Sequence, residues 1–304
     1  MQPIRKAESG DDDRAATQPA AGVRVREIKT ADLPAVAALL TRGFAFRSEA
    51  YWLRGLERHA ARPRPAGYPA YGYCLDHQGM PVGVVLLLFS NVQADDGVSI
   101  VRANVSSWYV EPPFRAFGSM LVRAATRDKT VTYFNITPAP HTWPQVEAQG
   151  FSVYCKGQIY AALALAKPRA GVTVEAFSER ERVGLSPYES DLLRAHAGWG
   201  CLSLVARDAD RAHPFVFQKH HVKNILPVHR LLYCRDLADI ELNAGNLGRF
   251  LARKGGALVR LDANGPMKII TGWYSERRGR KYAKGPHAPR LGDLAFSEAA
   301  LFDG

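Results

Sequence analysis

The chain has 304 residues, of which 47% are hydrophobic and 23% are charged, as in a globular protein long enough for two domains. Its longest apolar run, Val82–Phe89, is the size of a strand, so we expect no membrane span, and the N-terminus lacks the apolar core of a signal peptide. The formal net charge of +11 favours a polyanionic partner, such as coenzyme phosphates, an acidic sugar or nucleic acid.

Cysteine, histidine and motif patterns narrow the class of protein. None of the motifs GxSxG, GxxxxGK[ST] and HExxH occurs, which leaves a hydrolase without support. The cysteines show no CxxC spacing, which indicates reduced thiols and a cytoplasmic location, and the histidines of the second half match no metal spacing, so we expect no metal. These residues are Cys74, Cys155, Cys201 and Cys234, and His213, His220, His221 and His229.

In the first half, strand and helix patterns follow a polar leader. Residues 1–22 show no periodicity, and we expect them to be disordered. Beyond them Thr30 is expected to cap the first helix. Strands are expected at Val23–Ile28, Ala70–Asp76, Met80–Phe89, Val105–Val110, Val131–Ile136 and Phe151–Ala166, where one or two strands close the unit. Helices are expected at Ala31–Gly43, Ser48–Ala61, Phe114–Asp128 and Thr142–Gln149.

The central feature of this half is a strand followed by a turn and a helix, beginning at Val105. The strand Val105–Val110 ends at Pro112-Pro113, because proline lacks the donor that a strand ladder needs. A short turn, Phe114–Ser119, then leads into the next helix. The first turn of a helix leaves backbone N–H groups unpaired at a positive dipole end, so a phosphate or pyrophosphate fits there, with Arg115 as a further cation.

This stretch resembles the coenzyme A-binding motif of the GNAT superfamily of acyl-CoA-dependent acyltransferases, [Q/R]-x-x-G-x-[G/A]. Here it reads Arg115-Ala116-Phe117-Gly118-Ser119-Met120, with Met120 in place of a small residue. The order of elements over Val23–Lys167 is also similar to that superfamily, as is the turn Gln149-Gly150-Phe151. The resemblance implies an α/β fold, in which helices flank a mixed twisted sheet.

The resemblance also implies an acyl-CoA, acetyl-CoA or another, as cosubstrate. It would lie in a V between the central strand and the next one, and a backbone N–H at Val110 or its neighbour would polarise the acyl carbonyl. Arg115 and the amides that follow it would hold the pyrophosphate. The residues expected to contact the coenzyme are Tyr109, Val110, Arg115, Ala116, Phe117, Gly118, Ser119, Met120 and Asn135.

The general base and acid are open. Many members of the superfamily have a glutamate on the central strand where this chain has Asn104, and many have a tyrosine between Thr137 and Phe151, where this chain has none. The candidates are Glu111, Tyr154 and His141, each weighed against an ordinary surface or packing role.

After a linker at Lys167–Gly171, residues 172–304 repeat the pattern loosely. Further strands are expected, including Cys201–Arg207 and Leu226–Cys234, and a helix at Gly245–Lys254. We interpret this half as a second, degenerate GNAT-like domain after the first at residues 23–167. Its segment Asn243–Arg249, aligned with the coenzyme motif, lacks the Arg-x-x-Gly turn, so we expect it to bind no coenzyme and to shape the substrate groove or hold the first domain.

The leading hypothesis is an N-acyltransferase that acetylates a small amine. Two alternatives stay open, a GNAT-like binding or regulatory protein without catalysis and an acyltransferase associated with nucleic acid. The basic run Arg277–Arg290 could grip phosphates or be a solvated loop, and nucleic acid is the less favoured partner. The acceptor, the acyl chain length and the choice between monomer and homodimer are not fixed by the sequence.

Overall fold

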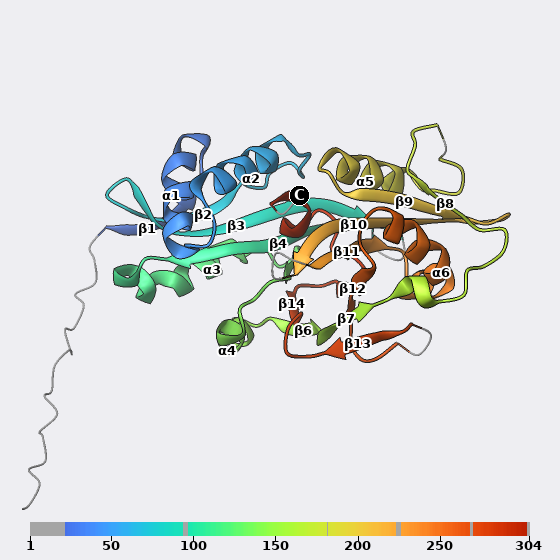
Figure 1. Cartoon of the computed structure of the whole chain (residues 1–304). Coiled ribbons are helices and arrows are strands. Elements are labelled where there is room, and N and C mark those ends of the chain that lie inside the picture. The colour runs from blue at the N-terminus through green and yellow to red at the C-terminus, as the bar shows by residue number, and fades with distance from the viewer. Residues whose placement is uncertain (1–21, 94–96, 181, 223–225, 268–269, 303–304) are drawn as a thin grey trace, which may run out of the picture.

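The computed structural model describes residues 22–93, 97–180, 182–222, 226–267 and 270–302. The leader expected at residues 1–22 lies outside the described residues, apart from Gly22. The described strands form two mixed sheets with helices on their faces (Figure 1), so the expected α/β class is confirmed.

The first sheet has the strand order β1-β2-β3-β4-β5-β14-β6. All described neighbours in it are antiparallel except β4 and β5, which are parallel. The strands are β1 (Val23–Glu27), β2 (Gly72–His77), β3 (Met80–Gln93), β4 (Ser99–Val110), β5 (Thr132–Asn135), β14 (Lys281–Lys284) and β6 (Ser152–Cys155).

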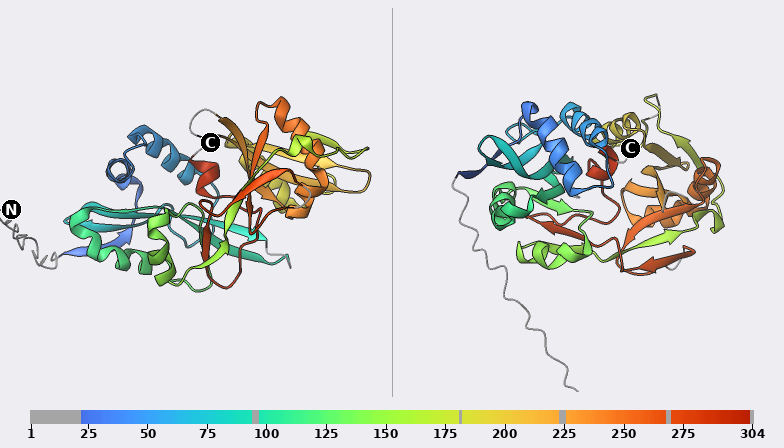
Figure 2. Two further views of the ribbon diagram at one scale, coloured as in Figure 1. Left: turned by 60° about the horizontal axis from the view of Figure 1, so that its bottom comes forward. Right: turned by 60° about the vertical axis from the view of Figure 1, so that its left-hand side comes forward.

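Helices cover both faces of this sheet, which explains why β3 is a continuous apolar run. Val84, Leu86 and Leu88 pack in the cluster that contains α1 (Leu33–Gly43) and α2 (Glu49–Ala61). The alternate residues of β3 pack in the cluster that contains α3 (Gly118–Ala125) and α4 (Trp143–Ala148). Figure 2 shows the blue helices α1 and α2 and the green helix α3 on opposite sides of the strands.

The helices of the first half begin close to their expected positions. Ser48 caps α2 by accepting a hydrogen bond from the Tyr51 N–H. Thr30 does not cap α1, because it begins a 3-10 turn, η1 (Thr30–Asp32), in which the Asp32 carboxylate accepts the Lys29 N–H.

The second sheet has the strand order β13-β7-β12-β11-β10-β9-β8. α6 (Leu237–Arg253) packs on one face, with the 3-10 turn η4 (Leu163–Leu165) beside it, and α5 (Pro187–Gly198) packs on the other. The helix that we expected at Gly245–Lys254 is α6, which begins earlier, at Leu237. The strands are β13 (Gly272–Ser275), β7 (Gly157–Ala161), β12 (Leu258–Ala263), β11 (Leu226–Cys234), β10 (Ala212–Val222), β9 (Leu202–Arg207) and β8 (Thr173–Ala176).

Each sheet contains one strand from the other half of the chain. β7 leaves the first half to pair with β12 and β13, while β14 from the second half lies between β5 and β6. A buried ion pair of 2.7 Å joins Lys281 of β14 to Asp262 of β12. The sheets therefore cross the expected linker at Lys167–Gly171, and the two-domain boundary stays a prediction.

The face of the first sheet that meets the second half shares a core with it. Phe134 and Ile136, at β5, are buried in one cluster with Val216 and Leu232 of the second sheet. The C-terminal segment, with the short helix α7 (Glu298–Leu301), belongs to the same cluster and reaches α2, where Figure 1 shows the C-terminal end. This segment brings residues of the second half to the central strand β4.

Candidate active site

The strands β4 and β5 separate partway along their length. Their parallel pairing covers Arg102–Asn104 and Thr132–Phe134, and β4 then continues to Val110 along β3. Ser107 is an extra residue in β4, since Val85 pairs with Trp108 and Leu86 pairs with Ser106, and its φ is +30°. Such a bulge bends a strand and re-aims its side chains. The result is the V-shaped opening that the resemblance implied.

A cleft of about 600 Å³ occupies this opening. One wall is β4 from Val105 to Tyr109, and another is the segment after β5, with Asn135, Thr137 and His141. The remaining lining comes from the end of α1, the connection to α2 and the first turn of α2, from Thr142 and Val146 at α4, and from α7 with Phe302. Of the expected site residues, the structure thus brings Tyr109, Asn135 and His141 together.

Glu298 lies at the point where the two strands diverge. Its backbone N–H donates to Asn104 Oδ1 over 2.7 Å, and Asn104 Nδ2 donates to the Phe134 carbonyl over 3.1 Å. One carboxylate oxygen accepts from Thr137 Oγ1 over 2.5 Å, and the other accepts from Ser106 Oγ. Our sequence reasoning missed Glu298. The nearest signal in the sequence is Asn104, an amide at the position where the resemblance led us to expect a carboxylate.

Hydrogen bonds from both halves of the chain hold the segment before Glu298 in place. Arg102 of β4, 4% exposed, donates to both oxygens of Asp293 over 2.9 Å and to the Ala295 carbonyl over 2.8 Å. His196 Nε2 accepts the Phe296 N–H over 3.2 Å, while Nδ1 lies 2.8 Å from the Leu192 carbonyl. Burial lowers the pKa of His196 to about 4, so the ring is neutral and can accept at Nε2.

The predicted phosphate turn is open to solvent but tighter than expected. Residues Pro112–Phe117 form a 3-10 helix, η2, that runs into α3, and the Gly118 N–H donates to the Arg115 carbonyl. The Gly118 amide is therefore already used, which corrects the expectation of a free donor there. Arg115, Ala116, Ser119 and Met120 are exposed, whereas Val110 and Phe117 pack in the core.

Gly118 links the turn to the cleft. A methyl group added there would lie 3.6 Å from Trp108, which lines the cleft. The turn thus contacts a wall residue of the cleft, although none of the residues 112–120 lines the cleft itself.

Two of the three expected catalytic residues do not line the cleft. Glu111 Oε1 accepts from Arg42 over 2.7 and 3.0 Å, outside the lining. Tyr154 is enclosed by the core shared between the halves, and burial raises its pKa well above the ordinary value, so it holds its proton away from the cleft. His141 is exposed at the cleft.

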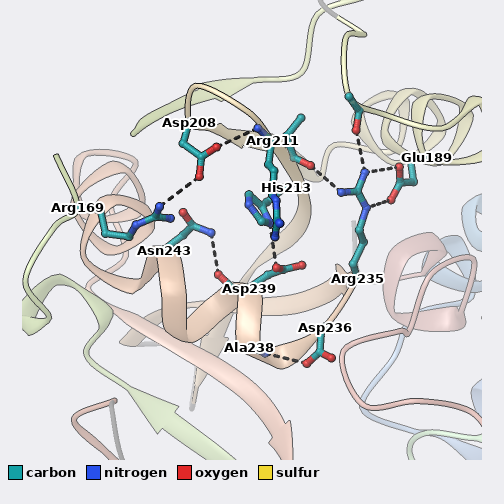
Figure 3. A network of polar contacts seen from close by, with 12 residues as sticks. Arg169, Glu189, Asp208, Arg211, His213, Arg235, Asp236, Ala238, Asp239 and Asn243 are labelled. Atoms are coloured by element: carbon teal, nitrogen blue, oxygen red, sulfur yellow. Dashed lines mark hydrogen bonds and ion pairs between the residues drawn. The ribbon is translucent and has the colours of Figure 1, made fainter. Parts of the chain in front are cut away.

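The second half has no equivalent opening among the described residues. Beyond the pairing of β11 with β12, the chain's own segment fills the space: Leu294 N–H donates to the Leu232 carbonyl over 2.7 Å, and Cys234 N–H to the Gly292 carbonyl over 2.9 Å. The Asp236 carboxylate accepts the Ala238 N–H over 2.8 Å at the start of α6 (Figure 3), where an anion would otherwise sit.

The segment Asn243–Arg249 lies inside α6. It is therefore not the counterpart of the coenzyme motif, which corrects our alignment. Its glycines serve packing instead, because a methyl group at Gly245 would lie 2.5 Å from the Ala166 carbonyl oxygen and one at Gly248 would lie 2.1 Å from the Ala164 nitrogen.

Several cations of the basic run have partners within the protein. Arg280 stacks over Trp143 at 4.1 Å, Lys281 pairs with Asp262, and Lys284 Nζ donates to the Gln149 carbonyl over 2.9 Å. These contacts favour a structural role over a phosphate grip. Within the ranges that the structure covers, no three His, Cys, Asp or Glu side chains gather as a metal site would need, and no helix has the length and apolar character to span a membrane.

Comparison with known proteins gives similarity in structure but not in sequence. No protein-family model matches the chain, and no curated protein matches it. A candidate acetyltransferase from Pyrococcus horikoshii has a TM-score of 0.56 at 11% identity, over 96% of this chain and 97% of its own. A GCN5-related N-acetyltransferase from Anabaena variabilis ATCC 29413 has a TM-score of 0.55 at 11% identity, over 86% of this chain and 72% of its own.

A conserved protein from Enterococcus faecalis V583, described as a candidate N-acyltransferase, has a TM-score of 0.53 at 12% identity, over 90% of this chain and 73% of its own. Identities this low establish the fold alone. The resemblance inferred from the motif is confirmed at that level, and the two sheets correspond to two modules in tandem. The chain has the fold of the GCN5-related N-acetyltransferases.

Proposed function

We propose that the protein is an acyl-CoA-dependent N-acyltransferase that transfers an acetyl group to a small amine. The observation that carries this proposal is the V-shaped cleft between β4 and β5, whose wall residue Trp108 lies next to Gly118 of the solvent-exposed Arg115 turn. The four cysteines are free and buried, which suits the reducing cytoplasm that we propose as its location.

The coenzyme would run along the unpaired part of β4. Its pyrophosphate would meet Arg115 and the first turn of α3, at Ser119 and Met120, and its pantetheine arm would pass Tyr109 and Asn135. Trp108 also lines the cleft, where its ring can pack against the arm.

In the reaction, the amine nitrogen attacks the thioester carbonyl carbon. The C–N bond forms, the C–S bond breaks, one proton leaves the nitrogen and the departing thiolate takes up a proton. Holding the two reactants in one cleft supplies much of the rate increase, because it removes the entropic cost of a bimolecular encounter. His141, exposed at the cleft, is a candidate for moving a proton.

Calorimetric titration with acetyl-CoA tests the proposal. Arg115→Glu should weaken binding by about tenfold or more at low salt, since it replaces a cation facing phosphate by an anion. Arg123→Glu is the matched control, because Arg123 is also exposed but lies further along α3. Failure of the wild-type protein to bind acetyl-CoA, or equal losses in both variants, would contradict the proposed site.

A coenzyme-binding protein without catalysis is the second candidate. Asn104 in place of a carboxylate and the engaged Gly118 amide favour it. Acetyl-CoA binding without thiol release across a panel of amines would support this candidate over the enzyme.

A further inference from the structure

We propose that the second sheet carries a binding site for a phosphate group attached to an aromatic ring, as in a nucleotide, with Arg230 and Arg260 as phosphate ligands and Trp273 as the stacking partner of the ring. These side chains belong to one row across the face of the sheet that α6 does not cover. The site lies apart from the cleft between β4 and β5, since none of the three residues lines that cleft.

The pairing of the strands places the row. Arg230 of β11 is paired with Arg260 of β12, Arg260 with Tyr160 of β7, and Tyr160 with Trp273 of the edge strand β13. Figure 1 shows these four strands next to one another. Residues paired across a sheet point to the same face, and successive residues of a strand point to opposite faces. The alternate residues of these strands are buried in the cluster that contains α6, so the row lies on the other face: Ile159, Leu231, Val259 and Leu261.

The two arginines have positive charge that the described part of the protein does not neutralise. Arg230 is 6% exposed, and its Nε is enclosed without a partner among the described residues. Arg260 has a hydrogen bond to Tyr160, and burial together with the adjacent Arg230 lowers its pKa to about 10. Asp262, the acid that acts on Arg260, is already paired with Lys281 over 2.7 Å. Two enclosed cations side by side are unfavourable unless an anion joins them.

The corresponding position in the first sheet has partners within the protein. Arg230 and Arg260 are the last pair before β11 and β12 separate, as Asn104 and Phe134 are before β4 and β5 separate. The side-chain oxygen and nitrogen of Asn104 both have backbone partners. In the second sheet, the segment 292–294 bonds to β11 only beyond the arginine pair. The donors of this pair therefore remain available to a ligand.

Gln218 extends the row onto β10, where it is paired with Arg230. Its Nε2 donates to the Ala299 carbonyl, while its Oε1 is enclosed and has no partner in the part of the chain that the structure describes. The site thus offers several donors and one acceptor. A phosphate monoester has oxygens for the arginines, and its protonated form, with a pKa of about 6, has a hydroxyl for Gln218. An ionised carboxylate has no such donor, so the combination favours phosphate.

Trp273 forms the outer end of the row. It is 65% exposed, and a large aromatic side chain left in water marks a contact surface. Neighbouring strands are about 4.8 Å apart, so Trp273 lies about 10 Å from Arg260, two strands away. Tyr160 and Arg260 are half-buried and Arg230 is buried. Exposure therefore falls along the row, which suits a small molecule that enters with its phosphate first and leaves its ring on the tryptophan.

Calorimetric titration with three probes tests the inference. AMP has both the ring and the phosphate, ribose 5-phosphate has only the phosphate, and adenosine has only the ring. The wild-type protein should bind AMP more tightly than either fragment. Equal affinity for AMP and adenosine would show that the phosphate is not recognised, and equal affinity for AMP and ribose 5-phosphate would show the same for the ring. Either result, or no binding of AMP, would overturn the inference.

Variants assign the two ends of the row. Arg260→Gln should weaken the binding of AMP and ribose 5-phosphate by about tenfold and leave adenosine within about twofold. Trp273→Ala should weaken AMP and adenosine by about fivefold and leave ribose 5-phosphate within about twofold. Arg253→Gln is the matched control, because Arg253 is exposed on α6, at the other face of the sheet. Equal losses of AMP binding in Arg253→Gln and Arg260→Gln would show only a general attraction to a basic protein.

Stability without ligand gives a second readout, which separates a binding role from a structural one. Arg230→Met removes one of two adjacent cations, so its urea midpoint should equal or exceed that of the wild-type protein. Saturating AMP should raise the midpoint of the wild-type protein and leave that of Arg230→Met unchanged. A lower midpoint in the variant, together with an equal response to AMP, would assign Arg230 to the fold alone.

Acetyl-CoA distinguishes this site from the one in the proposed function, because it also has an adenine ring and phosphates. Arg260→Gln should bind acetyl-CoA within about twofold of wild type, and Arg115→Glu should bind AMP within about twofold, since each site depends on its own cation. A loss of acetyl-CoA binding in Arg260→Gln would assign the row to the coenzyme and refute a separate site. Binding of AMP through Arg260 in a protein that does not bind acetyl-CoA would refute the proposed function and leave this inference standing.

Discussion

The backbone N–H of Glu298 donates a 2.7 Å hydrogen bond to the side-chain oxygen of Asn104, which lies 194 residues earlier in the chain. This contact makes the cleft of the first sheet depend on the second half of the protein. The second half has filled its own equivalent opening with residues 292–294, and the same segment continues to Glu298. The two modules therefore differ in role, because one forms the cleft and the other contributes a side chain to it.

We expect Asn104→Asp to destabilise the protein by about 3 kcal/mol or more. Asn104 is fully buried, and the substitution removes the Nδ2 donor to the Phe134 carbonyl and brings a second carboxylate near Glu298. Urea unfolding at pH 7 measures the loss. The control is Asn91→Asp, since Asn91 is exposed on β3 and its change should stay within about 0.5 kcal/mol. Similar midpoints for both variants would contradict the buried network.

His196 should make the stability depend on pH between 6.5 and 4. Burial lowers its pKa to about 4 in the folded protein, while the unfolded chain has a pKa near 6.5. Within this window the unfolded chain binds a proton that the folded protein excludes. The contribution of His196 to the free energy of unfolding is therefore complete above pH 6.5. It falls as the pH drops, by about 3 kcal/mol at pH 4.

His196→Gln should lose this dependence while retaining a donor and an acceptor for Leu192 and Phe296. Unfolding in urea at several pH values between 7.5 and 4 gives the slope. His59, also buried with a lowered pKa, contributes to the wild-type slope, so the variant should keep a smaller one. His287→Gln, at an exposed site, should behave as wild type. An unchanged slope in His196→Gln would refute the assignment.

The stability of the protein should depend on the buried lysine of the exchanged strand β14. Lys281 is 2% exposed, and its Nζ lies 2.7 Å from Asp262 and 2.9 Å from the Gly279 carbonyl. Lys281→Met should cost about 3–5 kcal/mol, because it leaves Asp262 buried without its cation. Adding Asp262→Leu should recover part of that loss in urea unfolding. A double variant that is less stable than Lys281→Met would show that the cation was not what the aspartate needed.

Much of the first sheet followed from local patterns. The apolar run of β3, the break at Pro112-Pro113 and the turn at Gly118 each depend on consecutive residues, and they led to the order of elements along the chain. The V-shaped opening was expected from the resemblance to the GNAT superfamily. The resemblance also gave Tyr109 and Asn135 as coenzyme contacts and left His141 as a candidate acid or base, and these three residues line the cleft.

What the sequence did not reveal depends on contacts between distant residues. β14 is the short run Lys281–Lys284, which begins and ends with a lysine. From the sequence, Lys281 looks like a surface residue, because its partner Asp262 lies on another strand. Glu298 has no local pattern of its own, and only the fold brings it beside Asn104. The segment of α6 that we aligned with the coenzyme motif has glycines that serve close packing against η4 and the linker, which the sequence did not indicate.

Gly248→Ala should destabilise the protein although alanine is the better helix former. Gly248 lies inside α6, where the substitution alone would favour the helix by about 1 kcal/mol. The added methyl group would lie 2.1 Å from the Ala164 nitrogen and 2.3 Å from the Leu163 carbonyl carbon, so the backbone of η4 must move. Such overpacking costs about 1–3 kcal/mol, which outweighs the helix preference.

The matched variant is Gly198→Ala, at the end of α5, where an added methyl group meets nothing within 4 Å. That variant should be neutral or more stable by up to about 1 kcal/mol. Thermal and urea unfolding of both variants should therefore give shifts of opposite sign or of clearly different size. If Gly248→Ala were as stable as Gly198→Ala, the turn before the linker would not be packed against α6, and the route of β7 into the second sheet would need another explanation.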